Sequence, residues 1–178
     1  MLIRHGETDA NRDMRIAGRS EAQLTAAGRA SAAALAEWAW PSIRLFVSPQ
    51  QRAQDTARLA FPSIPAATLP DLRERDWGHF EGLPVAELPQ REKTPDGGEP
   101  WDDMIGRVGR ALEAGLDRSG PEALPVFVAH SGVIRAARHL LGFDPHGPSP
   151  HNAQPLLYEP GAGAWHETYL EGAPEWTA

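Results

Sequence analysis

The sequence has no cysteine among its 178 residues. This absence excludes a disulfide framework, a metal site with thiolate ligands and a catalytic thiol. No apolar run approaches the roughly 18 residues that a membrane-spanning helix needs. The chain begins Met1-Leu2-Ile3-Arg4-His5, which is too short and too soon charged for a signal peptide. From these absences we expect a cytoplasmic protein that has no membrane segment.

Positive charge is in the minority, because the formal net charge at pH 7 is −7. We therefore expect neither nucleic acid nor an anionic membrane as the main partner. A small anionic substrate is still compatible with this charge, since a cleft can concentrate positive potential locally. Arg4, Arg12, Arg15 and Arg19 crowd the first twenty residues. Of these, Arg12 and Arg15 are interpreted as solvated side chains.

Strand and helix signals alternate along the chain. Strand-like apolar runs cover residues 43–47, 66–69, 124–129, 154–158 and 164–169, after a short apolar start. Helical signals follow the caps Thr25 and Ser48, form an apolar stripe over residues 101–115, and cover residues 131–141. This alternation predicts one α/β domain over residues 1–178. It would be a three-layer sandwich with a mostly parallel central sheet and helices on both faces.

Residues 70–100 are rich in proline and glycine and show no regular periodicity. A long irregular stretch inside a compact domain is often functional. Trp77 and Trp101, which lie in or next to this stretch, are interpreted as packing residues. We expect the stretch to contribute to a site.

Reactive side chains follow three of the expected strands. Arg4 and His5 follow the first apolar stub, Ser48 and Arg52 follow the strand at 43–47, and His130 follows the strand at 124–129. Ligands of open α/β sheets bind outside the carboxyl ends of the strands. We therefore expect these side chains to meet at one edge of the sheet.

The chemistry that suits these residues is phosphate chemistry. Arg4 and Arg52 can offer forked donors, and backbone N–H groups near Gly6, Ser48 and Ser131 can supply further hydrogen bonds to a phosphate. Two histidines at strand ends indicate either a metal site or covalent phosphoryl transfer. A metal is the weaker option because neither histidine has a carboxylate at ligand spacing and Arg4 would repel a divalent cation. A neutral imidazole beside two guanidiniums suits nucleophilic attack on phosphorus.

Specific motifs, which occur in order over nearly the whole chain, resemble those of a known family. They are Arg4-His5-Gly6-Glu7-Thr8 with Asn11, Gly18 with Leu24-Thr25-x-x-Gly28, Ser48-Pro49-x-x-Arg52-Ala53-x-x-Thr56-Ala57, Leu72-x-Glu74-x-x-x-Gly78-x-Phe80-Glu81-Gly82, Gly97-Gly98-Glu99, and Val128-Ala129-His130-Ser131-Gly132-Val133-Ile134-Arg135. The chain thereby resembles branch 1 of the histidine phosphatase superfamily, the branch that includes phosphoglycerate mutase. It is most similar to the phosphatase-type members.

The resemblance implies a role for each matching residue. His5 would be the phosphorylated nucleophile, and Arg4, Arg52 and His130 would hold the transferring group. Asn11 would add a donor, Ser131 would lie among the substrate-binding residues, and Glu74 would give a proton to the leaving oxygen and later help to activate water. No metal and no cofactor are implied. The expected partner is a small-molecule phosphomonoester, such as a sugar or nucleotide-loop phosphate.

Several alternatives stay open from the sequence. The chain could be a phosphoglycerate mutase-type transferase, a phosphate-binding scaffold without chemistry, or a metal hydrolase. Glu74 could instead form a surface ion pair with Arg73 or Arg75. The physiological substrate and the oligomeric state are left open. Only three residues precede Arg4, where relatives have a longer strand, and this could leave the first strand weakly paired.

Hydrolysis is favoured over mutation by the segment between Gly82 and Glu99. A mutase must hold its doubly phosphorylated intermediate and keep water out, which calls for extra cover and extra cations. In the mutases that this chain resembles, this segment is longer and carries several arginines and lysines. In this chain the segment has only two cations, Arg91 and Lys93. We therefore expect water to reach phosphorylated His5.

Overall fold

A sheet with the strand order β3-β2-β4-β1-β5-β6 forms the centre of the molecule. The computed structural model describes residues 1–172, and residues 173–178 of the expected domain lie outside the described residues. The strands are β1 (Leu2–Arg4), β2 (Ile43–Val47), β3 (Ala66–Thr68), β4 (Leu124–Ala129), β5 (Pro155–Pro160) and β6 (Trp165–Tyr169). Strands β1 to β4 pair in parallel, whereas β5 pairs antiparallel with β1 and β6. The mostly parallel sheet expected from the sequence is confirmed.

Strand β1 lies inside this sheet although it is only three residues long. Leu2 is paired with Phe127 of β4 on one side and with Leu156 of β5 on the other. All three side chains belong to the same buried cluster. The expectation that β1 could be weakly paired is therefore wrong, because neighbours on both sides hold it.

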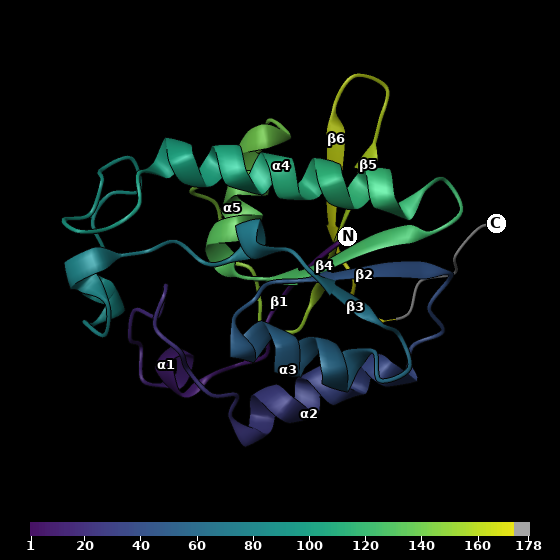
Figure 1. Ribbon diagram of the computed structural model, residues 1–178, viewed down its shortest axis with the longest axis horizontal. Helices are drawn as coiled ribbons and strands as arrows, with labels where there is room; N and C mark the ends of the chain where they lie inside the picture. The colour runs from purple at the N-terminus through teal and green to yellow at the C-terminus, as the bar shows by residue number, and fades with distance from the viewer. Residues whose placement is uncertain (173–178) are drawn as a thin grey trace.

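Helices cover both faces of the sheet, as Figure 1 shows. Helices α2 (Ala26–Ala34) and α3 (Gln51–Ala60) lie on one face, and α4 (Trp101–Ser119) and α5 (Ser131–Leu140) lie on the other. Successive strand residues point to opposite faces. Accordingly, Phe46 is buried in the cluster that contains Met104 of α4, whereas its neighbours Leu45 and Val47 are buried with Ala57 of α3. The chain is thus an α/β domain of three layers.

The start of α2 follows the sequence pattern, and the start of α3 does not. Thr25 caps α2, because its hydroxyl oxygen accepts a hydrogen bond from the Gly28 amide at 3.0 Å. For α3 the pattern predicts Ser48 as the cap, but the helix begins at Gln51 with Gln50 as its N-cap residue. The Ser48 hydroxyl is instead bonded to a distant side chain. The expected core face of α3 is confirmed, since Ala53, Thr56, Ala57 and Ala60 are buried.

The irregular stretch between β3 and α4 contains three short 3-10 helices: η2 (Pro70–Leu72), η3 (Gly78–Phe80) and η4 (Val85–Glu87). Two other short helices are α1 (Asp9–Arg12) and η1 (Leu35–Glu37), and η1 continues from the end of α2. In Figure 1 the stretch runs from the edge of the sheet to the N-terminal end of α4. It thereby passes the carboxyl ends of the parallel strands.

Among the described helices, none is both long and apolar enough to cross a membrane.

Candidate active site

Three strand ends bring the expected residues to one edge of the sheet. Arg4 ends β1, and the amide of the next residue, His5, donates to the carbonyl oxygen of Ala129 in β4 at 2.9 Å. His130 follows directly after β4 and is the N-cap residue of α5. The rings of His5 and His130 meet edge to face, with 5.2 Å between their centroids. The expectation that the two histidines share one location is therefore confirmed.

The loop after β1 is fixed by direct contact between backbones. A Cβ atom on Gly6 would collide with the backbone of Gly28 in α2, and a Cβ atom on Gly28 would collide with the backbone of Glu7. The amide of Gly6 also donates to the hydroxyl oxygen of Thr56 at 2.9 Å. Both glycines are therefore required by close approach rather than by backbone angle. Gly6, the residue after His5, is thereby in contact with both helices of this layer.

The orientation of the His5 ring leaves one nitrogen available. Nδ1 lies 2.8 Å from the carbonyl oxygen of Gly6, which can only accept, so Nδ1 carries the proton and donates it. Burial, followed by the charges of Arg52 and Arg4, holds the pKa of His5 well below its usual value of 6.5. The imidazole is therefore neutral near pH 7. Among the described residues its Nε2 has no hydrogen-bond partner, so its lone pair is available, as a nucleophile requires.

His130 is fully buried, with 0% of its surface exposed. Its Nε2 lies 2.7 Å from the hydroxyl oxygen of Ser48, and its Nδ1 is buried without a hydrogen-bond partner among the described residues. Burial is the main cause that lowers its pKa well below 6.5, with Arg52 and His5 acting in the same direction. His130 is thus a neutral ring with one polar atom left unsatisfied.

Arg4 and Arg52 are both anchored by backbone carbonyl groups. Arg4 Nη1 donates to Pro150 O at 2.8 Å. Arg52, which is 1% exposed, donates to Ser20 O at 2.8 Å and to Gly18 O at 2.8 Å. Arg52 therefore fixes the loop before α2, a role that the sequence does not indicate. In residues 1–172 the buried side-chain nitrogens without a partner are Arg4 Nε, Arg52 Nε and His130 Nδ1.

Glu74 is held by backbone amides rather than by an arginine side chain. One carboxylate oxygen accepts from the amide of Arg75 at 2.8 Å, and the other accepts from the amide of Gly132, in the first turn of α5, at 3.0 Å. None of the ion pairs between described residues includes Glu74, and Arg73 pairs with Asp71 and Glu99 instead. The surface ion pair considered from the sequence is therefore absent, and Glu74 points toward the start of α5.

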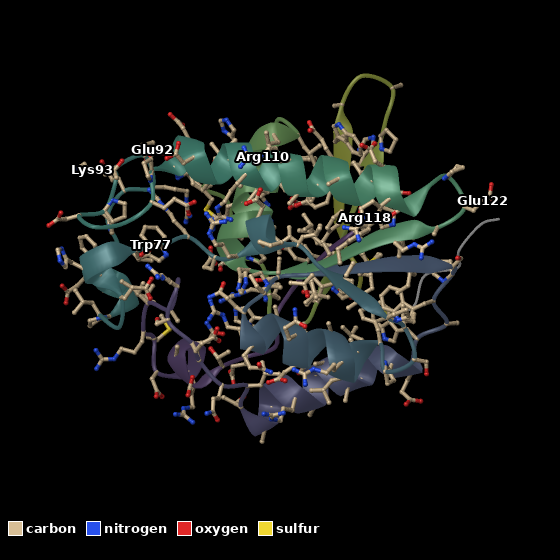
Figure 2. All side chains as sticks on the ribbon, viewed as in Figure 1. Trp77, Glu92, Lys93, Arg110, Arg118 and Glu122 are labelled. Carbon is tan, nitrogen blue, oxygen red and sulfur yellow. The ribbon has the colours of Figure 1, made fainter. Side chains whose placement is uncertain are left out.

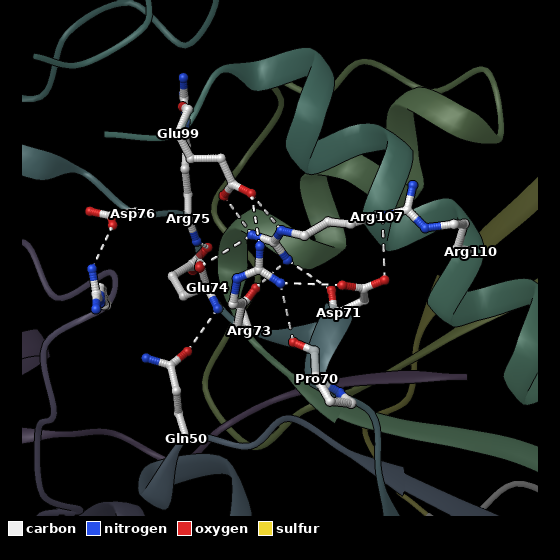
Figure 3. Close-up of polar contacts among 11 residues, drawn as sticks. Gln50, Pro70, Asp71, Arg73, Glu74, Arg75, Asp76, Glu99, Arg107 and Arg110 are labelled. Atoms are coloured by element: carbon white, nitrogen blue, oxygen red, sulfur yellow. Dashed lines mark hydrogen bonds and ion pairs between the residues drawn. The ribbon is translucent and has the colours of Figure 1, made fainter. Parts of the chain in front are cut away.

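The backbone of Glu74 is held from both sides, as the close-up in Figure 3 shows. Gln50 accepts from the Glu74 amide at 2.7 Å, and Arg107 of α4 donates to the Glu74 carbonyl oxygen at 3.2 Å. Arg107 is 2% exposed and also forms an ion pair with Glu99 at 2.6 Å. The sequence reasoning missed both supporting residues. Gln50 fits the pattern of a helix start, and Arg107 occupies one position of a long amphipathic helix, so neither gives a signal of its own.

The segment from Gly82 to Glu99, which we call the rim, is held by Arg75, a residue that is completely buried. Its guanidinium donates to the carbonyl oxygens of Glu99, Arg91 and Lys93 at 2.9, 2.7 and 3.0 Å, and lies 4.6 Å from the centroid of the Trp77 ring. Figure 2 shows Trp77 and Lys93 at the same end of the molecule. Trp77 and Trp101 are each 7% exposed, which confirms that they are packing residues.

Asn11 and Ser131 lie at the same edge of the sheet with less direct indications of a role. The side-chain oxygen of Asn11 accepts from the Thr8 amide at 3.1 Å and from Asn152 Nδ2 at 3.2 Å, so only its Nδ2 is left to donate. Ser131 begins α5 directly after His130. Asn152 also donates to the carbonyl oxygen of His5 at 2.8 Å. No sequence signal points to Asn152, because it lies in a loop 147 residues from His5.

A cavity of about 810 Å³ opens next to Glu74. Of the five expected catalytic residues, Glu74 alone lines this cavity. The other lining residues include Asp76, Asp102, Arg73 and Arg110. Its walls therefore carry both signs of charge. In the described part of the chain, no group of three or more His, Asp or Glu side chains is arranged to hold a metal ion.

The family model described as the histidine phosphatase superfamily (branch 1) matches residues 1–166. The chain belongs to this family. A curated relative from Bacillus subtilis (strain 168), named uncharacterized phosphatase PhoE, is 31% identical over 154 residues, which cover 81% of this chain and 78% of the relative. A relative from Arabidopsis thaliana, named metal-independent phosphoserine phosphatase, is 32% identical over 156 residues, which cover 76% of this chain and 65% of the relative.

Solved structures agree with this membership. The protein TTHB049 from Thermus thermophilus superimposes with a TM-score of 0.72 at 34% identity, covering 87% of this chain and 89% of that chain. A structure from Escherichia coli K-12 superimposes with a TM-score of 0.80 at 25% identity, covering 95% of this chain and 93% of that chain. Other relatives of this chain are named phosphoglycerate mutases. As a member of this family, the chain is therefore a phosphatase or a mutase.

Proposed function

We propose that this family member hydrolyses small-molecule phosphomonoesters through a phosphohistidine on Nε2 of His5, without a metal and without a cofactor. The observation that carries the proposal is a neutral His5, 5% exposed, whose Nε2 has no hydrogen-bond partner among the described residues, together with buried nitrogens of Arg4, Arg52 and His130 that likewise lack partners there. Unpaired buried donors are costly unless a ligand satisfies them. A phosphoryl group, whose oxygens only accept hydrogen bonds, suits a site of this kind.

In the first step the substrate phosphoryl group lies between Arg4, Arg52 and His130, with the Asn11 amide and the backbone N–H group of Ser131 as further donors. The lone pair of His5 Nε2 forms a bond to phosphorus, and the bond from phosphorus to the leaving oxygen breaks. Glu74 in its acid form gives its proton to that oxygen, so that an alcohol leaves.

In the second step Glu74, now a carboxylate, takes a proton from a water molecule. The water oxygen bonds to phosphorus, the bond between phosphorus and Nε2 breaks, and inorganic phosphate and neutral His5 remain. Glu74 loses a proton in the first step and regains one in the second, so its carboxyl group must stay in position between the two steps. Its hydrogen bonds with two backbone amides hold it there.

The choice of water as the acceptor is supported by the rim. Its backbone is fixed by Arg75 at Arg91 and Lys93, the two cations of the rim segment. A fixed and short rim leaves the site accessible to water. The names of the Bacillus and Arabidopsis relatives, a phosphatase and a metal-independent phosphoserine phosphatase, favour the same choice.

The deciding experiment has two arms. The enzyme is incubated with a panel of small phosphomonoesters, and separately with 3-phosphoglycerate plus 2,3-bisphosphoglycerate, in the presence of EDTA. We expect phosphate release from at least one ester, no isomerisation, and a base-stable, acid-labile phosphoenzyme. Isomerisation much faster than phosphate release would overturn the choice of hydrolysis.

The matched variants are His5→Ala and His139→Ala. We expect His5→Ala to lose the phosphoenzyme and at least about a thousandfold in rate. His139 is exposed on α5, and its removal should leave both unchanged. Wild-type rates in His5→Ala would mean that the nucleophile lies elsewhere.

A further inference from the structure

Ser48 and His130 form a buried contact across two neighbouring strands. Ser48 follows β2 and His130 follows β4, and both side chains are 0% exposed. Their closest polar atoms, Ser48 Oγ and His130 Nε2, are 2.7 Å apart. The sequence pattern indicates a different role for Ser48, that of a helix cap. Since α3 starts three residues later, the hydroxyl is not needed to cap this helix.

The direction of this hydrogen bond follows from the other contact of Ser48. Within residues 1–172 the Ser48 hydroxyl has one further polar contact, with the amide of Gln50 at 3.3 Å, and that amide can only donate. The hydroxyl proton therefore has one available acceptor, His130 Nε2. If Nε2 carried a proton instead, the buried Ser48 proton would have no partner, which costs roughly 1–3 kcal/mol.

The proton on the ring then belongs to Nδ1. A neutral imidazole has one N–H group, and an Nε2 that accepts leaves Nδ1 as the donor. Nδ1 is the buried atom without a partner in the described part of the chain, like Arg4 Nε and Arg52 Nε. With Nδ1 protonated, all three are donors. A bare Nδ1 would present a lone pair to the oxygens of a phosphoryl group and repel them.

From this geometry we infer that Ser48 is a positioning residue, which holds His130 as the Nδ1–H tautomer so that His130 donates to the phosphoryl group. The inference rests on the proposed function for the identity of the acceptor. It adds that the Ser48 hydroxyl, without contacting the substrate itself, determines which nitrogen of the His130 ring carries the proton. Neither Ser48 nor its neighbour Gln50 needs to touch the substrate for this role.

The tautomer can be measured directly by NMR of protein labelled with ¹⁵N-histidine, because protonated and bare ring nitrogens resonate far apart. The His130 signals are assigned by their loss in His130→Gln. In the wild-type protein we expect a proton on Nδ1 and none on Nε2. A proton on Nε2 would overturn the inference, and this measurement needs no variant of Ser48.

Three variants test the consequence for binding, with inorganic phosphate as the probe. Ser48→Ala removes the hydroxyl, Ser48→Thr keeps it, and Ser119→Ala removes a buried hydroxyl that is bonded to Gly115 in α4. We expect Ser48→Ala to populate the Nε2–H tautomer and to weaken phosphate binding by about tenfold to a hundredfold. Ser48→Thr should restore both, and Ser119→Ala should change neither.

The outcomes separate this inference from the proposed function. An unchanged tautomer and unchanged phosphate affinity in Ser48→Ala would contradict the inference, even if the enzyme hydrolyses phosphomonoesters. The expected tautomer shift and loss of phosphate affinity, in a protein that releases no phosphate from any ester, would support the inference and contradict the proposed function. A purely structural role of Ser48 would lower stability in Ser48→Ala without moving the His130 proton.

Discussion

Arg107 holds Glu99 with two hydrogen bonds, of 2.6 Å from Nε and 2.7 Å from Nη2. The same guanidinium reaches the carbonyl oxygens of Asp71, Arg73 and Glu74. One buried cation therefore connects α4 to the segment that carries the proposed acid. Such a buried pair is costly to break, because the remaining carboxylate keeps its desolvation penalty.

We therefore expect Arg107→Met to lower the free energy of unfolding by about 3 kcal/mol or more. The matched control is Arg110→Met, one turn along α4, whose side chain is 67% exposed and lies 3.4 Å from Asp71. Its removal should change stability by less than about 0.5 kcal/mol. Urea denaturation measures both, and equal losses would mean that burial of the pair is not what stabilises the segment.

Glu74→Gln tests the proposed acid. An alkyl phosphate has a poor leaving group that needs the proton, whereas an activated aryl phosphate does not. We expect kcat/KM to fall by about a hundredfold or more for the alkyl ester and far less for p-nitrophenyl phosphate. Glu87→Gln, at an exposed residue of η4, should affect neither. Equal losses on the two esters would show that Glu74 is not the acid.

The buried histidines predict how stability depends on pH. The pKa values of His5 and His130 in the folded protein lie well below 6.5, chiefly because of burial. Below about pH 6.5 the unfolded chain binds protons that the folded protein does not, so acid favours unfolding. Each histidine should lower the free energy of unfolding by about 1.4 kcal/mol per pH unit, from pH 6.5 down to its folded pKa.

Urea denaturation at pH 7.5, 6.5 and 5.5 measures this effect. His130→Gln should have a shallower loss of stability than the wild-type protein between pH 6.5 and 5.5. His139→Gln, at an exposed position, should keep the wild-type slope. Parallel curves for the wild-type protein and His130→Gln would mean that His130 titrates normally in the folded state.

Arg75→Met tests the fixed rim. The variant loses three hydrogen bonds to the backbone at Glu99, Arg91 and Lys93, so the rim should open more often. Trypsin cleaves after arginine and lysine, and we expect cleavage at Arg91 and Lys93 to accelerate by at least about tenfold. Arg73→Met removes a 48% exposed side chain that lies before the rim in the sequence, and it serves as the control. An unchanged cleavage rate in Arg75→Met would contradict the anchoring role.

The sequence was sufficient to place His5, Ser48 and His130 at one sheet edge, because apolar runs mark the strands and the strand ends follow from them. It was not sufficient for the groups that hold the site. Ser48 fits a local cap pattern, yet its partner lies 82 residues away. Contacts such as Asn152 with His5 leave no periodic or local signal. Only the resemblance to a family selected Glu74 among its acidic neighbours.

Arg52 anchors the loop at Ser20 and Gly18, and its Nε is buried without a partner among the described residues, which leaves it available for the proposed phosphoryl group. Natural selection for folding alone would therefore preserve it. His5 has no comparable anchoring side-chain bond among the described residues beyond its own neighbour, Gly6. A descendant that lost its chemistry would exchange His5 early and keep Arg52. In a comparison of many relatives, we therefore expect His5 to be replaced in copies that have lost the activity, and Arg52 to persist wherever the fold persists.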